Sequence, residues 1–200
     1  MDLSCSYYTV GCKICQNSIM EDFVMNSTIY TCTIAAPLGE IRAAAEDEAL
    51  TGLWFTGQKY FPAKIDGWVE NDGYGVFDAL RSWLGAYFSG SNVAQRSVEI
   101  LSGIKLAPHG TAYQKTVWDQ LLKIPYGATT TYGEIARRAA AALKKSSASA
   151  QAAGGAVGHN PISLVIPCHR VIGADGSLTG YAGGLDRKKA LLEMERGGTL

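Results

Sequence analysis

Two kinds of hydrophobic pattern divide the chain into a strand-rich part and a helix-rich part. In the first part, β-branched and aromatic residues alternate with polar ones, and Pro37-Leu-Gly39 is typical of a turn. The strand candidates are 27–34, 41–45 and 50–55. Because they are short and close together, they predict a small antiparallel sheet. Apolar side chains then recur at helical spacing over 75–88, which predicts a helix, and the turn-rich segment 89–108 is the predicted linker.

The second part is predicted to be mainly helical. Thr111 and Gln114 have the spacing of a capping box, and Pro125-Tyr-Gly127 would end the helix that they open. Three further helices are predicted, over 132–144 after a Thr131 cap, over 150–157 and over 185–196. The helices at 132–144 and 150–157, joined by a Ser-rich turn, form a candidate helix-turn-helix. Two packed helices that never contact DNA would give the same pattern.

These elements predict an α/β (α+β) fold with two domains. A small antiparallel-sheet domain with one helix is expected over 27–105, and a mainly helical domain that contains the helix-turn-helix over 106–200. Residues 1–26 show no clean period and are predicted to be an N-terminal extension, either a disordered tail or an over-long translational start.

Composition and charge narrow the class of protein. Hydrophobic residues make up 47% of the 200 residues and charged residues 18%, which argues against disorder throughout the chain. No apolar run approaches the roughly 18 residues of a membrane helix, and the N-terminus lacks a signal pattern. We therefore expect a cytoplasmic protein without membrane contact, associated with the nucleoid if it is bacterial.

The net charge of zero hides an uneven distribution. Residues 1–110 carry seven Lys and Arg against twelve Asp and Glu, whereas residues 111–200 carry eleven against six. A polyanion would therefore bind the second part, because phosphate contacts supply most sequence-independent affinity for nucleic acid. Chance segregation of solvated charges is the alternative.

Five cysteines, at positions 5, 12, 15, 32 and 168, argue against a disulfide framework because their number is odd and no secretory signal precedes them. Cys12 and Cys15 form one C-x-x-C pair, and Cys5 and Cys32 could complete a structural zinc site. Such sites usually contain two tight pairs, and the second pair is missing. We expect free thiols, no metal and no cofactor.

One cysteine has a setting that suggests reactivity. The segment 163–172 reads as an apolar strand that is interrupted by Pro, Cys, His and Arg. A lone buried cysteine is usually inert, but Cys168 adjoins His169, and Asn160-Pro161 can form a turn just upstream. A thiol becomes a nucleophile when a nearby base or positive field lowers its pKa. Adjacent side chains of an extended segment point apart, so His169 would reach the sulfur indirectly, through a water. A thiol hydrolase that uses Cys168, His169 and Asn160 is one interpretation of this set.

A resemblance to a known family changes this picture. Pro167-Cys-His-Arg-Val171, preceded by Asn160-Pro161 and followed by Gly180-Tyr-Ala-Gly-Gly-Leu185, closely resembles the methylated-DNA–protein-cysteine methyltransferases, that is, the O6-alkylguanine-DNA alkyltransferase family. The similarity spans about 111–196, and Ala36-Pro-Leu-Gly39 with its following strands resembles the family's ribonuclease-H-like N-terminal domain.

The resemblance implies a DNA repair protein that acts once. It would bind alkylated double-stranded DNA as a monomer and flip the damaged base with a minor-groove helix-turn-helix. It would then move the alkyl group from O6-alkylguanine, and from O4-alkylthymine, to Cys168 without a cofactor. The rival is a DNA-binding module that recognises damage without turnover. The relatives that only bind lesions lack this cysteine.

The resemblance also assigns roles to individual residues. Cys168 would accept the alkyl group, His169 would remove the thiol proton through a water, and Glu195 would orient His169. The other implied catalytic residues are Asn160, which holds the turn, and Tyr132, which donates a proton to the departing guanine. The implied substrate-binding residues are Tyr181, Ala182, Gly183, Val157, Lys188 and Val171, whose carbonyl would read the guanine. The implied DNA-binding residues are Gln151, Ala152, Gly155, Arg137, Arg138, Lys144, Lys145 and Arg170.

Gln151 departs from the family pattern. It stands where the family usually has an arginine that replaces the flipped base in the stack, and the helix-turn-helix is about five residues longer than usual. Glutamine can form a hydrogen bond with the orphaned cytosine but lacks the charge and the planar fork of arginine.

Overall fold

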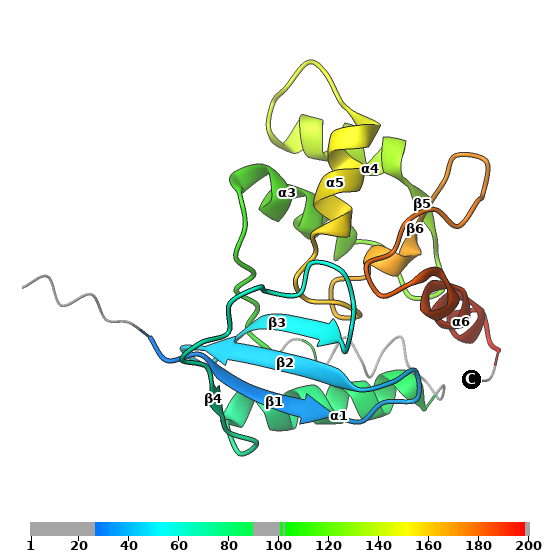
Figure 1. Ribbon diagram of the computed structural model, residues 1–200. Coiled ribbons are helices and arrows are strands. Elements are labelled where there is room, and N and C mark those ends of the chain that lie inside the picture. Colours follow the sequence, from blue (N-terminus) through cyan, green and yellow to red (C-terminus); the bar gives the residue numbers. More distant parts are fainter. Residues whose placement is uncertain (1–26, 90–100, 102, 199–200) are drawn as a thin grey trace, which may run out of the picture.

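The computed structural model describes residues 27–89, 101 and 103–198, and Figure 1 shows a strand-rich part below a mainly helical part. The N-terminal extension, with Cys5, Cys12 and Cys15, lies outside the described residues, as does most of the predicted linker. Cys32 is a buried free thiol. Among the described residues, no group of three or more His, Cys, Asp and Glu side chains could hold a metal ion. None of the helices in these ranges is long and apolar enough to cross a membrane.

The N-terminal part is a four-stranded sheet with the order β3-β2-β1-β4. Its strands are β1 Tyr30–Ile34, β2 Ile41–Glu46, β3 Ala49–Phe55 and β4 Val69–Glu70. The first three pair antiparallel as predicted, whereas β4 pairs parallel to β1 and makes the sheet mixed. The sequence pattern did not reveal β4, because it is two residues long and both of them are exposed.

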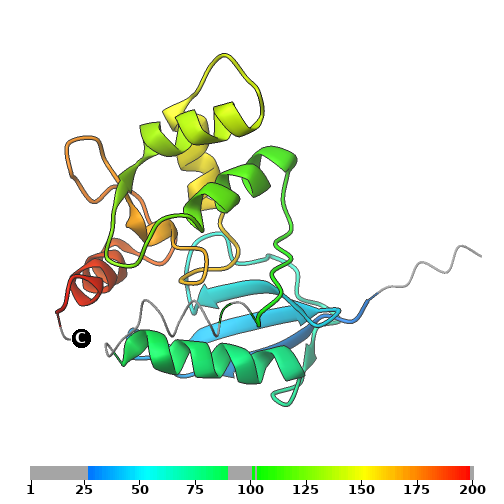
Figure 2. The same ribbon diagram turned by 180° about the vertical axis from the view of Figure 1, so that it is seen from behind.

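Helix α1 (Gly75–Phe88) has the bounds that its apolar spacing predicts. Its buried face packs against the sheet, and the helical part lies on the β3 side (Figures 1 and 2). All seven residues of β3 are buried. Leu53 explains part of this burial, because its backbone exchanges two hydrogen bonds of 2.8 Å with Pro161 and Ser163. The edge of the sheet is thus attached directly to the segment that precedes Cys168.

The helical part contains α3 (Ala112–Leu121), α4 (Tyr132–Ala142), α5 (Ala150–Gly158) and α6 (Leu185–Glu195). Both halves of the predicted capping box are present: Thr111 accepts from the Gln114 amide, and the Gln114 side chain accepts from the Thr111 amide. Thr131 caps α4 as predicted, and Ser149 caps α5. Helices α3, α4 and α5 pack against one another.

The segment 163–172 is not the strand that its apolar composition suggested. Cys168–Arg170 forms a 3-10 turn, and only Val171–Ile172 (β6) is a strand, paired parallel with β5 (Thr130–Thr131). Two features bend the chain here. Pro167 has no backbone N–H for a strand ladder, and Leu164 has a positive φ of 68°. Cys168 and His169 therefore lie in a 3-10 turn and not in an extended strand, so their side chains need not point in opposite directions.

Candidate active site

Cys168 lies in a tight turn that the side chain of Asn160 holds in place. The Asn160 amide nitrogen donates to the Ile166 carbonyl at 2.8 Å and lies 3.0 Å from the Cys168 sulfur. It also lies 3.3 Å from the Ile162 carbonyl, while the Asn160 side-chain oxygen accepts from the Ile162 amide at 3.0 Å. These contacts are local to 160–168 but bridge several residues, so one side chain fixes the position of the sulfur.

The environment keeps the thiol of Cys168 protonated at rest. Cys168 is buried, and this burial raises the pKa of its thiol, although the Asn160 hydrogen bond and the nearby Lys188 charge oppose the rise. Because a thiolate and not a thiol is the nucleophile, the site needs a base when it reacts.

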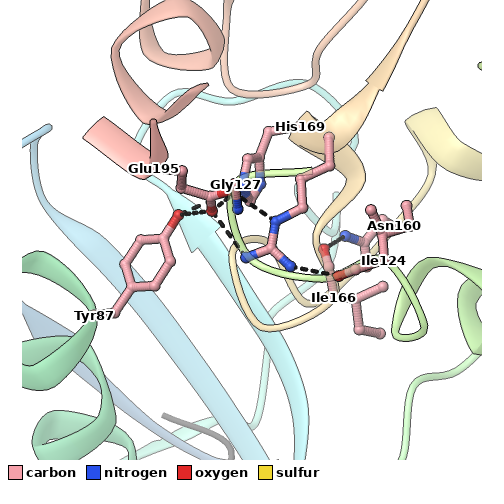
Figure 3. Close-up of polar contacts among 8 residues, drawn as sticks. Tyr87, Ile124, Gly127, Asn160, Ile166, His169 and Glu195 are labelled. Carbon is pink, nitrogen blue, oxygen red and sulfur yellow. Dashed lines mark hydrogen bonds and ion pairs between the residues drawn. The ribbon is translucent and has the colours of Figure 1, made fainter. Parts of the chain in front are cut away.

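That base can be His169, which belongs to a buried relay. Its Nε2 atom lies 2.8 Å from Glu195 Oε1, at the C-terminal end of α6, and both side chains are fully buried (Figure 3). The other ring nitrogen, Nδ1, has no hydrogen-bond partner among the described residues. Burial lowers the pKa of His169, although Glu195 opposes this, so the imidazole is neutral near pH 7 and able to accept a proton.

Glu195 is the centre of the polar network in Figure 3. Burial alone would raise the pKa of its carboxyl, but hydrogen bonds from His169 and Arg170 outweigh burial and hold that pKa far below its ordinary value. The Tyr87 hydroxyl donates to Glu195 Oε1 at 2.7 Å, and the Gly127 amide donates to Oε2 at 3.1 Å. The carboxylate is therefore permanently charged and fixed from several sides.

Arg170 belongs to this network, and its assignment to the DNA interface is wrong in this structure. Its guanidinium donates to both oxygens of Glu195, at 2.8 and 2.9 Å, and to the Ile124 carbonyl at 2.7 Å. Arg170 is only 8% exposed. A guanidinium that is buried and held by both oxygens of a carboxylate is not available to a phosphate.

A cavity of about 700 Å³ is lined in part by Tyr132 and Tyr181, both of which interact electrostatically with Cys168, although Cys168 is not among the described lining residues. Its walls are one face of α5, the loop 179–185, Tyr132, and two residues of the N-terminal part. The described lining residues are Lys59, Tyr60, Tyr132, Ala150, Gly154, Gly158, Thr179, Gly180, Tyr181, Ala182, Gly184 and Leu185. The cavity contains three of the predicted site residues, Tyr132, Tyr181 and Ala182. Gly183 is buried between the rings of Tyr181 and Phe55, which a Cβ atom would approach within 2.6 and 3.2 Å. Val157 is buried on α5.

Two polar groups near this cavity, those of Tyr132 and Lys188, are held by backbone carbonyls. The Tyr132 hydroxyl donates to the Thr179 carbonyl at 2.9 Å, and the Tyr181 hydroxyl is buried without a partner among the described residues. Lys188 is fully buried, and its Nζ contacts the carbonyls of Val171 at 2.6 Å and Thr179 at 2.8 Å. Burial lowers the pKa of Lys188 to about 8. Lys188 thus fastens the loop 179–185 to β6 and occupies one side of the Val171 carbonyl.

The outer face of α5 carries small and neutral residues. Gln151, Ala152 and Gly155 are exposed, and a Cβ atom at Gly155 would meet nothing within 4 Å. Such a surface allows the helix backbone to approach another molecule closely.

The basic residues of the helix-turn-helix are exposed, and two of them are paired. Arg137 and Arg138 both form ion pairs with Glu134, at 2.6 and 2.8 Å. Lys144 and Lys145 lie exposed in the connection between α4 and α5. All four side chains are on the surface. The single negative charge of Glu134 balances one of the two positive charges of Arg137 and Arg138.

Sequence reasoning missed Tyr87, which comes from the N-terminal part and reaches the relay. Tyr87 lies one turn after Trp83 on the buried face of α1, so its spacing indicated only a core aromatic residue. A phenol on an otherwise apolar buried face is a weak signal, since a buried Tyr hydroxyl usually finds a polar partner. Lys59 and Tyr60 were missed as well, because nothing local connects them with the cavity.

Comparison with known proteins places this geometry in context. The family described as "6-O-methylguanine DNA methyltransferase, DNA binding domain" matches residues 112–197, and its "ribonuclease-like domain" matches residues 29–100. The methylated-DNA–protein-cysteine methyltransferase of Mycolicibacterium paratuberculosis is 44% identical over 164 residues, which cover 82% of this chain and 90% of the relative. The corresponding protein of Haemophilus influenzae is 38% identical over 170 residues, covering 85% and 88%.

Solved structures agree with these relatives. A crystal structure of Mycobacterium tuberculosis OGT in complex with DNA superimposes with a TM-score of 0.72 at 39% identity, covering 85% of this chain and 94% of that one. A crystal structure of the Mycobacterium tuberculosis O6-methylguanine methyltransferase gives a TM-score of 0.69 at 38% identity, covering 86% and 96%.

Proposed function

The chain belongs to the 6-O-methylguanine DNA methyltransferase family, and we propose that it repairs DNA by transferring the alkyl group of O6-alkylguanine to its own Cys168. The observation that carries this proposal is the geometry of the reactive turn. A buried thiol is held by Asn160 and is followed directly by a neutral histidine that is hydrogen-bonded to a buried carboxylate. A nucleophile, a base and an acid that orients the base make up the minimal set for thiol chemistry.

In the proposed reaction, the Cys168 proton passes through a water to His169 Nδ1, the ring nitrogen that has no protein partner among the described residues. The thiolate attacks the alkyl carbon in line with the bond to guanine O6. The S–C bond forms as the C–O bond breaks, and the bond's electron pair leaves with the guanine. Glu195 stabilises the imidazolium, and Lys188 stabilises the thiolate, as its electrostatic coupling to Cys168 indicates.

Tyr132 is the proposed proton donor to the departing guanine. Its hydroxyl lies at the cavity wall, and burial raises its pKa, so the phenol keeps its proton until a stronger acceptor arrives. The product is a thioether, which water does not cleave under mild conditions. Each molecule therefore acts once.

The DNA partner is proposed to be an alkylated duplex. A methyl carbon on paired guanine cannot meet a buried sulfur in line, so the nucleotide must leave the stack and enter the cavity. We assign the small outer face of α5 to the minor groove, with Gln151, Ala152 and Gly155 closest to the bases. Arg137, Arg138, Lys144 and Lys145 are assigned to phosphates, and Gln151 to the space that the extruded nucleotide leaves.

The decisive experiment follows the methyl group. The protein is incubated with duplex DNA that carries a radiolabelled methyl group on guanine O6, and the label is then sought on protein and located by mass spectrometry. We expect one methyl group per molecule, on Cys168, and none in Cys168→Ala, which should still bind the DNA. Binding without any transfer by the unaltered protein would favour a module that only recognises damage. Repeated turnover with excess substrate would favour a thiol hydrolase.

A further inference from the structure

A turn of the N-terminal part, 56–60, forms one wall of the cavity that Tyr132 and Tyr181 also line. Lys59 and Tyr60 both line the cavity, although they are 72 to 126 residues away in sequence from the other residues that line it. The turn is anchored on the reactive side: the Lys59 amide donates to the Ala182 carbonyl at 3.0 Å, and the Gln58 side-chain oxygen accepts from the Ser163 hydroxyl at 3.2 Å. The position of this wall relative to the reactive turn is therefore fixed.

Tyr60 combines a strained backbone with a largely exposed side chain. Its φ of 62° is unfavourable for a bulky residue, yet its side chain remains 55% exposed. The ring stacks on His159 with 3.9 Å between ring centroids, and His159 Nδ1 donates to the Gly155 carbonyl at 2.8 Å. Strained backbone conformations cluster at functional sites, where the surrounding structure holds them in place.

Two tyrosines flank the cavity side of α5 one helical turn apart. A Cβ atom at Gly154 would lie 3.6 Å from the Tyr132 ring, and a Cβ atom at Gly158 would lie 3.7 Å from the Tyr60 ring. Because these glycines carry no side chain, both rings lie close to the backbone of α5, where even a methyl group would be in van der Waals contact with them. Tyr132 comes from the helical part and Tyr60 from the strand-rich part, so each part contributes an aromatic ring to the cavity wall.

Lys59 supplies the charge at this cavity. Among the described residues that line the cavity it is the single Lys or Arg, and none of them is Asp or Glu. The Lys59 side chain is exposed. Lys188 cannot take this part, because it is fully buried and its Nζ is bound to backbone carbonyls. A nucleotide that enters the cavity brings a neutral base and an anionic phosphate, and Lys59 is the group placed to meet the phosphate.

We propose that Lys59 binds a phosphate beside the extruded nucleotide, and that Tyr60, braced on His159, packs against the sugar of that nucleotide. This inference rests on the proposed function and extends it, because it makes the N-terminal part a direct component of the DNA-binding surface. The ligand class is a deoxynucleotide strand with one unstacked residue.

The test measures DNA binding as a function of salt. Full-length Cys168→Ala protein is titrated with a duplex that contains one O6-methylguanine, between 50 and 200 mM salt. The comparison is with the same protein carrying either Lys59→Met or Lys64→Met. Lys64 is the matched control, because it is exposed in the same segment but does not line the cavity. Loss of one phosphate contact reduces the slope of log affinity against log salt by about 0.9. The DNA affinity of the protein with Lys59, divided by that of Lys59→Met, should therefore fall roughly three- to fourfold between 50 and 200 mM salt. Lys64→Met should leave the slope unchanged.

A second substrate separates a contact with DNA from a structural effect. With Cys168 intact, Lys59→Met and Tyr60→Ala should slow the reaction with duplex DNA but not with free O6-benzylguanine, which has neither phosphate nor sugar. An unchanged salt slope in Lys59→Met would overturn the proposal. Equal slowing with both substrates would also overturn it, since it would mean that the turn only supports the loop 179–185. Failure of the proposed function is distinguishable, because the unaltered protein would then acquire no alkyl group from either substrate.

Discussion

The hydroxyl of Tyr87 connects the N-terminal helix with the reactive relay, and its removal tests the relay directly. Tyr87→Phe keeps the ring, which stacks on Trp83 at 5.1 Å and meets Tyr126 edge-on at 6.0 Å. It deletes the O–H that donates to Glu195 Oε1 at 2.7 Å. The hydroxyl also lies 3.4 Å from His169 Nε2, which is too long for a strong hydrogen bond.

The effect on stability follows from what Glu195 retains. A hydrogen bond to a charged group contributes about 1.5–3 kcal/mol. The carboxylate keeps its bonds from His169, Arg170 and Gly127, so no buried charge is left without donors. We therefore expect the lower end of the range, about 1.5 kcal/mol, or roughly a tenfold change in the folding equilibrium. Urea denaturation of the two proteins measures it.

The effect on reactivity has a definite sign. Glu195 Oε1 accepts from both Tyr87 and His169, so without the phenol it is a stronger acceptor for the imidazole. This stabilises the protonated ring and raises the pKa of His169, which burial holds below its ordinary value. Because His169 must be neutral to take the thiol proton, the rate falls as pH falls through this pKa. The acidic limb of the pH–rate profile with free O6-benzylguanine should therefore move to higher pH in Tyr87→Phe.

The matched control is Tyr126→Phe, which removes a neighbouring hydroxyl that makes no hydrogen bond to Glu195 in the described structure. It should leave the acidic limb in place. If Tyr87→Phe lowers the unfolding free energy but leaves the limb where it was, Tyr87 is a packing residue and the reasoning about the relay is refuted.

Three further predictions concern DNA and acid. Gln151→Ala should slow repair of duplex DNA by up to about tenfold, since a neutral hydrogen bond contributes about 0.5–1.5 kcal/mol, and should not affect free O6-benzylguanine; equal slowing of both would place Gln151 in the pocket or the fold. Replacing Lys144 and Lys145 together should reduce the salt slope of DNA binding by about 1.8 if each meets a phosphate; an unchanged slope removes both from the interface. The unfolding free energy should decrease as pH falls below about 6.5 and again below about 4.3, the ordinary pKa values of His and Glu. The reason is that the folded state lowers the pKa of both His169 and Glu195, so acid protonates these groups in the unfolded chain first. Thermal unfolding measured at a series of acidic pH values would contradict this if stability fell in neither pH window.

The helices were predictable from the sequence because their ends are fixed by neighbouring residues. The Thr111 and Gln114 capping box and the apolar face of α1 are local features, and the structure confirms both. The reactive turn was not predictable in the same way. Its shape depends on the Asn160 amide, which reaches carbonyls and the sulfur up to eight residues away, and no periodicity encodes such contacts.

The same limit explains the errors at the candidate site. The resemblance implied that Arg170 binds DNA, but its guanidinium is buried against Glu195, 25 residues later. Tyr87 and Tyr60 come from the other part of the chain, and they reach the site only because β3 attaches the sheet to the segment around Pro161. A resemblance to a family carries over motif residues, whereas contacts between the two parts appear only in three dimensions.

The resting charges of the relay suit a protein that is used once. Burial raises the pKa of Cys168 and lowers that of His169, so both are neutral before substrate arrives. A permanently ionised thiol in an accessible pocket would react with oxidants and other electrophiles, and each such event would consume one molecule. Here the permanent charges belong instead to Glu195 and Arg170, which neutralise each other through two hydrogen bonds away from the cavity. The thiolate is thus formed only as the proton moves to His169, when Glu195 can stabilise the new positive charge. The reactivity of Cys168 therefore depends on the whole relay. A variant that loses any part of it should transfer the alkyl group more slowly, but it should not become more reactive toward other electrophiles.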